Sequence, residues 1–322
     1  MSKRDCSIDV LKFVCAAFIV FLHTNWRYSE ELLPVTRFAV PCFFIISGYL
    51  LSDNKKVQQE RLKRTFRRIL SITLWATLFF FIWDEAVQVF RTGSLMIPTA
   101  KDIVKWVVFN ASPWGFHLWY MYAYLYVLLI VILVNKFSLW RLLYWFTPML
   151  LLAGLAFGTY GNLLWNWSLP YVCLRSFIFV GLPYFTIGTL LKRHQRPQWW
   201  ALKQLHLGCI VLFVLTTYLE RLFLINTDNF AFQEYFLSTT PLAVSAFLLA
   251  IAFRKEEPSF WSRLGEKDSL YIYIIHPVFM VCGRALNDVL QWQEAYSYIA
   301  PLVVLIATII SIKCLRKMKL IP

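Results

Sequence analysis

The stretch IDVLKFVCAAFIVFLHTNW, residues 8–26, predicts a membrane-spanning helix with ionisable groups at both ends and almost nothing polar between them. Asp9 and Lys12 are three residues apart, so they share a helix face near the N-terminal end. His23 comes three helical turns after Lys12, about 16 Å further along, and points roughly the same way. Snorkelling at the two interfaces is one explanation, but the alignment of the three side chains favours a functional passage between the two sides.

The composition of the chain requires lipid as its solvent. Of the 322 residues, 59% are hydrophobic, too many for a water-soluble protein of this size. Continuous apolar runs predict an all-α fold, a polytopic transmembrane helical bundle that forms one domain over residues 1–322. No secretory signal peptide is expected, because the first run is long, contains Lys12 and lacks a small-residue cleavage site. Ten spans are expected, at about 8–26, 35–52, 69–91, 116–135, 139–157, 172–191, 202–220, 236–253, 269–285 and 298–315.

The distribution of the net charge of +14 indicates membrane topology. If the N-terminus is cytoplasmic, ten spans place most of the 32 Lys and Arg residues in cytoplasmic segments. Both termini are therefore expected on the cytoplasmic side. A nucleic-acid partner is not expected, since the positive-inside rule accounts for the charge.

The most basic segment is KKVQQERLKRTFRR, residues 55–68, in the predicted loop between the second and third spans. A helix over this segment would gather Arg61, Arg64 and Arg68 along one side. Two interpretations remain open. The segment either anchors on anionic lipid or captures phosphate groups, for which the planar fork of arginine is well suited.

Polar residues near the outer ends of the spans are candidate substrate contacts. His117 and Trp119 begin the fourth span and Arg175 lies at the outer end of the sixth, although an interfacial aromatic belt also explains the tryptophan. The predicted outer loop 158–171 contains Trp-Asn-Trp at 165–167, and such residues suit the apolar faces and hydroxyl rims of sugars.

Two further candidates lie inside predicted spans. Ser47 and Gly48 interrupt an aromatic run, either for a close helix contact or for the approach of a ligand. His276 precedes Pro277, which frees the carbonyl of Tyr273 and predicts a kink. A hydrogen bond from His276 to a backbone carbonyl and a contact with a ligand both remain open.

Several kinds of chemistry have no support in the sequence. There is no P-loop, no GxGxxG, no GxSxG and no zinc-ligand spacing, and the seven cysteines form no CxxC pair. We therefore expect no metal site and no permanently bound cofactor.

Together, these motifs resemble the acyltransferase 3 family of bacterial integral-membrane acyltransferases over nearly the whole chain. The family's first span carries Asp, Arg and His at the spacing of Asp9, Lys12 and His23, so lysine stands here where arginine is usual. The other matches are FFIISGYLL at 43–51, the RxxR pair Arg64 and Arg67, HLWYMYA at 117–123 and SLYIYIIHP at 269–277.

The resemblance implies an O-acyltransferase, most simply an O-acetyltransferase, in the bacterial inner membrane. Its stand-alone members move an acyl group from acyl-CoA to a cell-surface polysaccharide or lipid-linked glycan. The implied catalytic residues are His23, Lys12 and Asp9, the CoA-binding residues are Arg61, Arg64, Arg67 and Arg68, and the substrate-binding residues are Ser47, His117, Trp119, Arg175 and His276. The alternatives are a transporter or flippase of a lipid-linked glycan, and a sensing protein that has lost activity.

Overall fold

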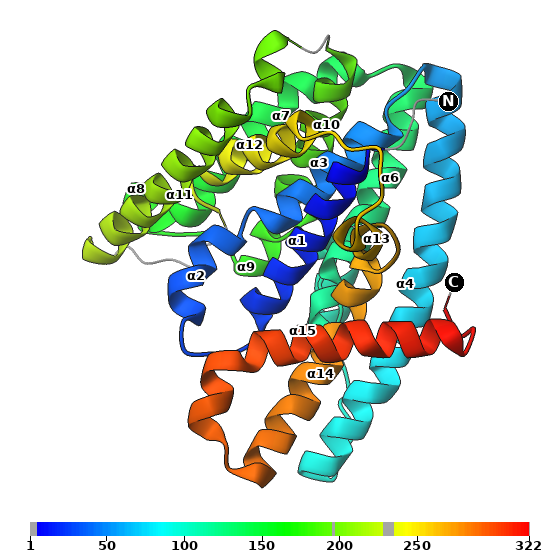
Figure 1. Cartoon of the computed structure of the whole chain (residues 1–322), viewed down its shortest axis with the longest axis vertical. Coiled ribbons are helices and arrows are strands. Elements are labelled where there is room, and N and C mark those ends of the chain that lie inside the picture. Colours follow the sequence, from blue (N-terminus) through cyan, green and yellow to red (C-terminus); the bar gives the residue numbers. More distant parts are fainter. Residues whose placement is uncertain (1–4, 195–196, 228–234, 322) are drawn as a thin grey trace. The chain divides into compact units, whose positions relative to one another are not determined.

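The computed structural model describes residues 5–194, 197–227 and 235–321, and all regular elements within these ranges are helical (Figure 1). By length and composition, nine helical segments among these residues can cross a membrane. A shorter apolar helix, α12 (Thr239–Ala252), matches the eighth predicted span. The prediction of an all-α polytopic bundle is confirmed. Lys3, Arg4 and Arg196, which contribute to the predicted charge pattern, lie outside the described residues.

The chain divides into two compact units that interleave along the sequence. Unit 1 comprises Met1–Phe43, Arg196–Leu224 and Phe236–Pro322, and unit 2 comprises Phe44–Gln195 and Ile225–Tyr235. Two of the four boundaries fall inside helices, α3 (Ala39–Leu51) and α11 (Lys203–Asn226). The single domain over 1–322 stays a prediction.

Unit 1 is built around α1 (Cys6–His23), which begins where the Asp5 side chain accepts a hydrogen bond from the Ser7 amide. The helices that pack on α1 are α2 (Ser29–Thr36), α12, α13 (Phe260–Lys267), α14 (Ser269–Leu290) and α15 (Gln293–Lys317). A 3₁₀ turn at Gln198–Ala201 contacts α12. The segment 27–34 between the first two predicted spans is not a simple loop, since α2 occupies most of it.

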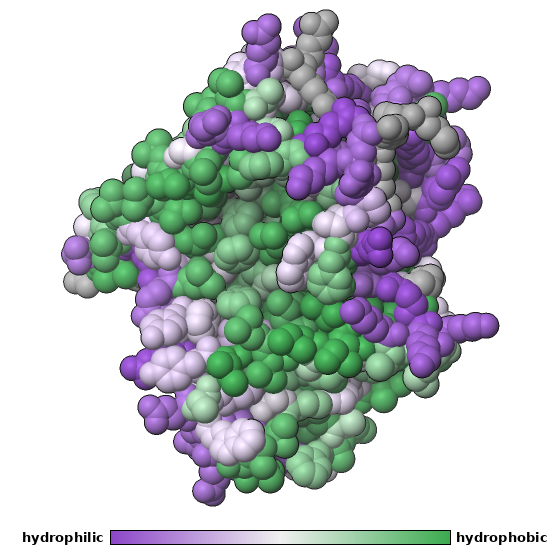
Figure 2. Space-filling model, in the orientation of Figure 1, coloured by the Kyte–Doolittle hydropathy of each residue, from purple (hydrophilic) through white to green (hydrophobic). Residues whose placement is uncertain are grey.

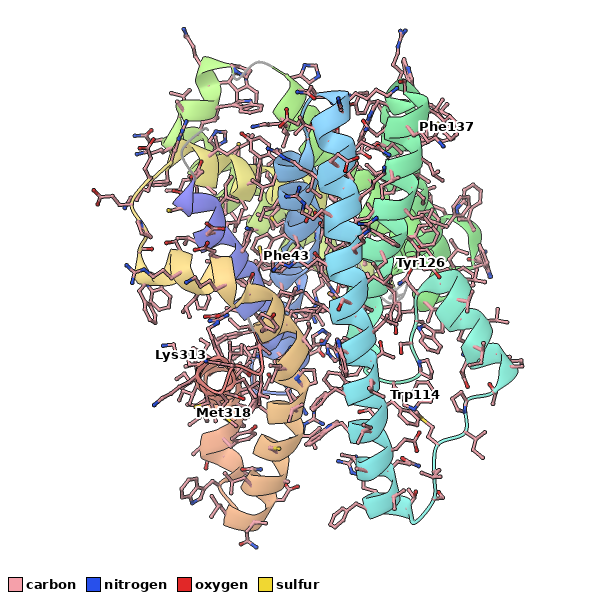
Figure 3. The ribbon with its side chains drawn as sticks, turned by 90° about the vertical axis from the view of Figure 1, so that its right-hand side faces the viewer. Phe43, Trp114, Tyr126, Phe137, Lys313 and Met318 are labelled. Atoms are coloured by element: carbon pink, nitrogen blue, oxygen red, sulfur yellow. The ribbon has the colours of Figure 1, made fainter. Side chains whose placement is uncertain are left out.

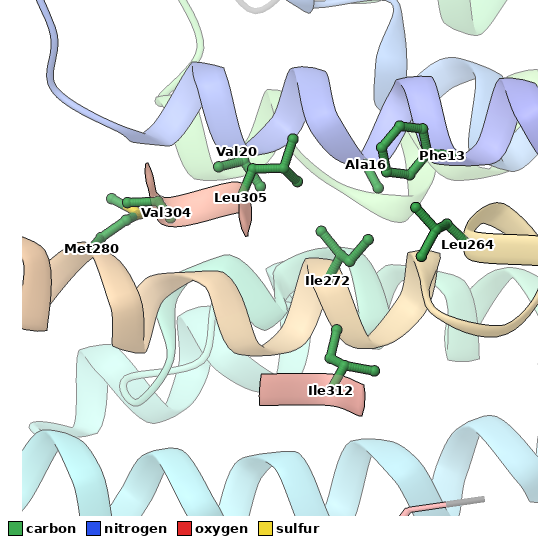
Figure 4. Close-up of a cluster of buried hydrophobic side chains, with 9 residues drawn as sticks. All are labelled: Phe13, Ala16, Val20, Leu264, Ile272, Met280, Val304, Leu305 and Ile312. Carbon is green, nitrogen blue, oxygen red and sulfur yellow. The ribbon is translucent and has the colours of Figure 1, made fainter. Parts of the chain in front are cut away.

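The core of unit 1 joins α1, α13, α14 and α15 (Figure 4). Figure 4 shows that α1 and α14 run in the same direction, because Phe13 and Val20 follow the same order as Ile272 and Met280. Two spans that run in the same direction are separated in the sequence by an odd number of membrane crossings. The long candidate helices between α1 and α14 give an odd number only if α12 also crosses the membrane. The core side chains are Phe13, Ala16, Val20, Leu264, Ile272, Met280, Val304, Leu305 and Ile312.

α15 lies across α1 and α14 (Figure 1). Arg316 near its end pairs with the buried Asp268 that precedes α14. Figure 2 shows hydrophobic side chains over α15, with hydrophilic ones gathered at its C-terminal end. Leu302, Ile306 and Ile310 are among its exposed residues, which is typical of a lipid-facing surface.

Unit 2 contains the longest helix, α4 (Lys55–Thr92). Its start is capped by the Asn54 side chain, which accepts from the Val57 amide at 3.1 Å, and it ends at Gly93, whose φ of 71° is left-handed. No Pro or Gly interrupts its 38 residues, which span about 57 Å against a hydrocarbon core of ~30 Å. The prediction of a separate loop at 55–68 is therefore wrong, and a helical basic segment is confirmed.

The other helices of unit 2 are shorter than the predicted spans. Unit 2 has two π-helical segments: Leu155–Thr159 ends the fifth span, and Phe177–Gly181 interrupts the sixth. These segments lie in consecutive spans of one unit. Transporters often have broken helices at corresponding positions of two halves, so this arrangement does not favour the transporter alternative. The remaining elements are α5 (Ala100–Phe109), η1 (Phe116–Leu118), α6 (Trp119–Phe137), α7 (Trp140–Gly154), α8 (Gly161–Trp165), α9 (Tyr171–Leu174) and α10 (Leu182–Arg193), of which α5 and α8 lie in predicted loops.

Candidate active site

The first candidate group is an ion pair on α1. The Lys12 Nζ lies 2.9 Å from the Asp9 Oδ1, and the Asp9 side chain is only 5% exposed. This contact confirms that the two residues share a helix face. A carboxylate buried to this extent needs a cationic partner, so Asp9 and Lys12 act as one unit.

The backbone under this ion pair is held by α13. A Cβ built on Gly265 would overlap the Asp9 carbonyl oxygen and approach the Phe13 amide nitrogen to 3.0 Å. Only glycine permits so close a contact between two helices. The packing of α13 therefore fixes the position of the Asp9–Lys12 pair within unit 1.

The second candidate group lies at the C-terminal end of α1, where His23 contacts His276 of α14. The two imidazole rings stack with their centroids 5.5 Å apart and their planes 19° from parallel. His23 is half-buried and His276 is completely buried. The sequence marks both residues as candidates, but it contains no signal that they meet, because 252 residues separate them.

The orientation of His276 follows from the proline beside it. Pro277 has no amide hydrogen, so the carbonyl of Tyr273 lacks its usual helical donor. The His276 Nδ1 lies 2.8 Å from this oxygen and 3.2 Å from the Ile272 oxygen. The predicted bond to a backbone carbonyl is thus confirmed, and the contact of His276 with substrate stays a prediction.

The four candidate CoA-binding arginines lie on the N-terminal part of α4, in unit 2. All four are exposed, and Arg61 pairs with Asp53 at 2.9 Å. The helix places Arg61, Arg64 and Arg68 one turn apart, as the sequence predicts. Exposed guanidinium groups at this spacing are available to a phosphate-bearing ligand.

An apolar depression of about 460 Å³ continues along α4 from this basic segment. Arg67 lies at one end of it, and the stripe beyond consists almost entirely of apolar side chains three and four residues apart. Its lining residues are Arg67, Leu70, Ser71, Leu74, Trp75 and Leu78. A cationic group next to an apolar wall suits a molecule with an anionic head and a less polar arm.

His117 is held against the C-terminal half of α4. Its completely buried ring meets Phe80 edge-on at a centroid distance of 4.6 Å. The loop before it is bound by two acidic residues of α4, since Asp84 accepts from the Gly115 amide at 2.6 Å and Glu85 accepts from the Trp114 indole at 2.9 Å. Figure 3 shows Trp114 beside α4.

Trp119 and Arg175 are brought together in the same unit. The Arg175 guanidinium lies 5.3 Å from the centre of the Trp119 ring and 4.2 Å from that of Tyr171. The buried Asn110 amide donates to the carbonyls of Trp119 at 3.3 Å and Arg175 at 3.2 Å. Asn110 thus links the start of α6 to the end of α9.

Ser47 lies in a close helix crossing of unit 2. A Cβ on Gly48 would overlap the Phe185 carbonyl, and a Cβ on Gly188 would overlap the Ile45 carbonyl. The close helix contact proposed for Gly48 is confirmed, and the contact of Ser47 with substrate stays a prediction.

Comparison with known proteins identifies the family. The model of the acyltransferase 3 family, described as an acyltransferase domain, matches residues 6–315. The chain belongs to the acyltransferase 3 family. It is thus a multi-pass membrane protein of an acyltransferase family.

Two curated relatives carry the names of racemases. An amino-acid racemase of Enterococcus faecalis is 24% identical over 313 residues, which are 89% of this chain and 42% of the relative. A serine/alanine racemase of Enterococcus gallinarum is 24% identical over 329 residues, which are 95% of this chain and 45% of the relative. The chain thus spans less than half the length of these relatives. No solved structure matches it.

The acyltransferase 3 motifs are divided between the two units. Unit 1 carries Asp9, Lys12, His23 and His276, whereas unit 2 carries the arginines, Ser47, His117, Trp119 and Arg175. Sequence reasoning missed three residues that position the unit 2 candidates, Asp84, Glu85 and Asn110. Two adjacent acids within the apolar run of α4 were the signal for the first two. In the described ranges, no group of three or more His, Cys, Asp or Glu could hold a metal ion, and the predicted absence of a metal stays a prediction.

Proposed function

We propose that this acyltransferase 3 chain moves an acyl group, most simply acetyl, from acyl-CoA to a hydroxyl of a cell-surface polysaccharide or lipid-linked glycan. The observation that carries the proposal is the His23 imidazole, held by a stacked ring at the end of an apolar span. The chain's membership of an acyltransferase family supports it. The proposed location is the bacterial inner membrane.

In the proposed reaction His23 is the general base. It takes the proton from the acceptor hydroxyl while that oxygen attacks the thioester carbonyl. A carbon–oxygen bond forms, the carbon–sulfur bond breaks and the proton on His23 passes to the departing thiolate, which gives free CoA and the ester. Thiols have a pKa of ~8.5, so thiolate is a good leaving group.

The basic residues have separate proposed roles. Arg61, Arg64, Arg67 and Arg68 bind the phosphates of CoA, supported by their exposure and spacing on α4. Lys12, whose charge is balanced by Asp9, assists at the reacting carbonyl. Lysine supplies a point charge there in place of the two-pronged guanidinium that the family usually has.

The proposed acceptor is a saccharide. Trp165 and Trp167, at the end of α8, are 56% and 54% exposed, and Asn166 lies between them. Exposed indole faces stack on the apolar faces of pyranose rings, and amides hydrogen-bond to hydroxyls. Ser47, His117, Trp119, Arg175 and His276 are the other proposed substrate contacts.

The test is the transfer of label from [¹⁴C]acetyl-CoA to membrane glycolipid by the purified protein in liposomes. The proposal predicts labelled glycolipid that loses its label in mild alkali, as an O-acetyl ester does. If no label is transferred, while the protein moves a labelled lipid-linked glycan across the bilayer, the chain is a transporter and the proposal is wrong. If it does neither, a protein that has lost activity is the remaining alternative.

A further inference from the structure

Beyond the proposed contact with substrate, the surroundings of the completely buried His276 ring point to a second role in the reaction. Four features of unit 1 converge on this ring: its stack with His23, its burial, its hydrogen bonds to the backbone and the proline beside it.

The stack constrains His23 on one side. His23 is the last residue of α1, and residues in the last turn of a helix are held less firmly than those inside it. A planar ring 5.5 Å away and 19° from parallel limits the rotation of the imidazole about its side-chain bonds. The plane of His23 is thus aligned with that of a completely buried neighbour.

The buried ring is itself fixed by the backbone of α14. Carbonyl oxygens only accept hydrogen bonds, so the Nδ1 of His276 carries the hydrogen that it directs at Tyr273 and Ile272. The Tyr273 oxygen is available because Pro277 supplies no amide. The proline thereby sets both the tautomer and the orientation of the His276 ring.

The surrounding core keeps the two helices in place. Val20 of α1 and Met280 of α14 lie in the hydrophobic core of unit 1, together with Val304 and Leu305 of α15 (Figure 4). Closely packed interiors resist displacement, so the distance between the two rings is maintained by the packing of three helices.

We infer that His276 is a positioning residue for His23. Its ring, oriented by the Tyr273 carbonyl that Pro277 leaves available, holds the His23 imidazole in the plane from which it takes the acceptor's proton. An aromatic face also stabilises a cation above it, so the stack favours the imidazolium that forms on His23 during transfer. This inference rests on the proposed function.

The test compares two substitutions that separate the ring from its hydrogen bond. His276→Phe keeps a planar ring without the Nδ1 donor, whereas His276→Gln keeps a donor without a ring. We expect His276→Phe to retain kcat for acetyl transfer within about fivefold. We expect His276→Gln to lower kcat at least tenfold, with KM for acetyl-CoA unchanged within twofold, because only the orientation of the base is lost.

A second readout does not depend on acyl transfer. Diethyl pyrocarbonate modifies exposed imidazoles, and mass spectrometry of the peptide containing His23 gives the rate at that residue. We expect this rate to rise several-fold in His276→Gln and to stay near the wild-type value in His276→Phe. The control is His206→Phe, since His206 is also buried and bound to a backbone carbonyl, that of Trp200, at 3.1 Å. It should change neither readout.

The outcomes distinguish a failure of the positioning role of His276 from a failure of the proposed acyl transfer. Equal loss of kcat in both variants would show that His276 takes part in proton transfer itself, and wild-type kcat in both would show that it has no role. Either result overturns the inference. If the wild-type protein transfers no acetyl group, the proposed function has failed, and the modification rates still decide whether His276 holds His23. Equal rates in all variants would overturn the positioning role.

Discussion

Lys12 is the residue at which the first span departs from the family's usual pattern. The structure shows it paired with a buried carboxylate, which is a role that any cation of suitable length can fill. A lysine ammonium forms this pair through one nitrogen, whereas a guanidinium could bind a carboxylate and a carbonyl at the same time. The pair with Asp9 therefore accounts for the positive charge at this position without explaining the choice of lysine.

The exposed arginines of α4 lead to a prediction about donor binding. Replacing Arg64 and Arg67 together by Ala would remove two of the proposed contacts with the phosphates of CoA, which would form before the chemical step. We expect KM for acetyl-CoA to rise about tenfold or more and kcat to change less, as measured by steady-state transfer kinetics.

The matched control removes the same charge from the same segment. Lys56 and Lys63 are also exposed on this part of α4, so the double change to Ala lowers the net charge equally. Its KM should stay within twofold of the wild-type value. If both double variants raise KM alike, the segment acts through its overall charge on lipid or ligand, and specific phosphate capture is wrong.

At the scale of helices, α13 packs closely against α1 beneath the candidate catalytic residue Asp9. Gly265→Ala places a methyl group where the Asp9 carbonyl oxygen lies, so α13 must move away from α1. We expect a loss of about 1–3 kcal/mol in the free energy of unfolding, the usual effect of overpacking. Thermal unfolding of the protein in detergent, followed by circular dichroism, measures it.

Gly208 of α11 supplies the control, because a Cβ added there has nothing within 4 Å. Ala has the higher helix propensity, so Gly208→Ala should leave the unfolding temperature unchanged or raise it. A Gly265→Ala variant as stable as the wild type would mean that the two helices do not approach as described.

Helix positions were largely predictable from the sequence, and helix ends were not. Apolar runs located the nine candidate spans of the described residues and the shorter apolar helix α12, since lipid imposes a minimum length on a span. The run at 55–68 looked like a loop because it is charged, but Arg, Lys, Gln and Glu are good helix formers and nothing in it breaks a helix. Likewise, α2 formed in a predicted loop although Pro34 lies inside it.

The candidate sites were predictable where the contacts lie within one helix, and not where they join two helices. Contacts within one turn, such as Asp9 with Lys12, follow directly from helix geometry. The bond from His276 to the Tyr273 carbonyl could be anticipated from Pro277, since both lie on one helix. The stack of His23 on His276 depends on how α1 packs with α14, and a single sequence does not encode that in any local pattern.

For the molecule as a whole, the main prediction concerns topology. If all ten predicted spans cross the membrane, both termini lie on the same side, and the distribution of basic residues predicts that this side is the cytoplasm. The shared direction of α1 and α14 agrees with a crossing by α12. We expect a reporter that works only in the cytoplasm to be active when it is fused after Pro322. A reporter active on the outer side would mean an odd number of crossings and would remove the assignment of sides.

The most direct test of the account is the rate of [¹⁴C]acetyl transfer by His23→Ala, measured beside the wild type and His194→Ala. His194 is an exposed histidine at the end of α10, so its loss should leave the rate unchanged. General-base assistance is worth ~10²–10⁴-fold, and we predict a loss of that size in His23→Ala, with expression and detergent stability near wild type. A loss smaller than tenfold in a well-folded His23→Ala protein would contradict the assignment of His23 as the base.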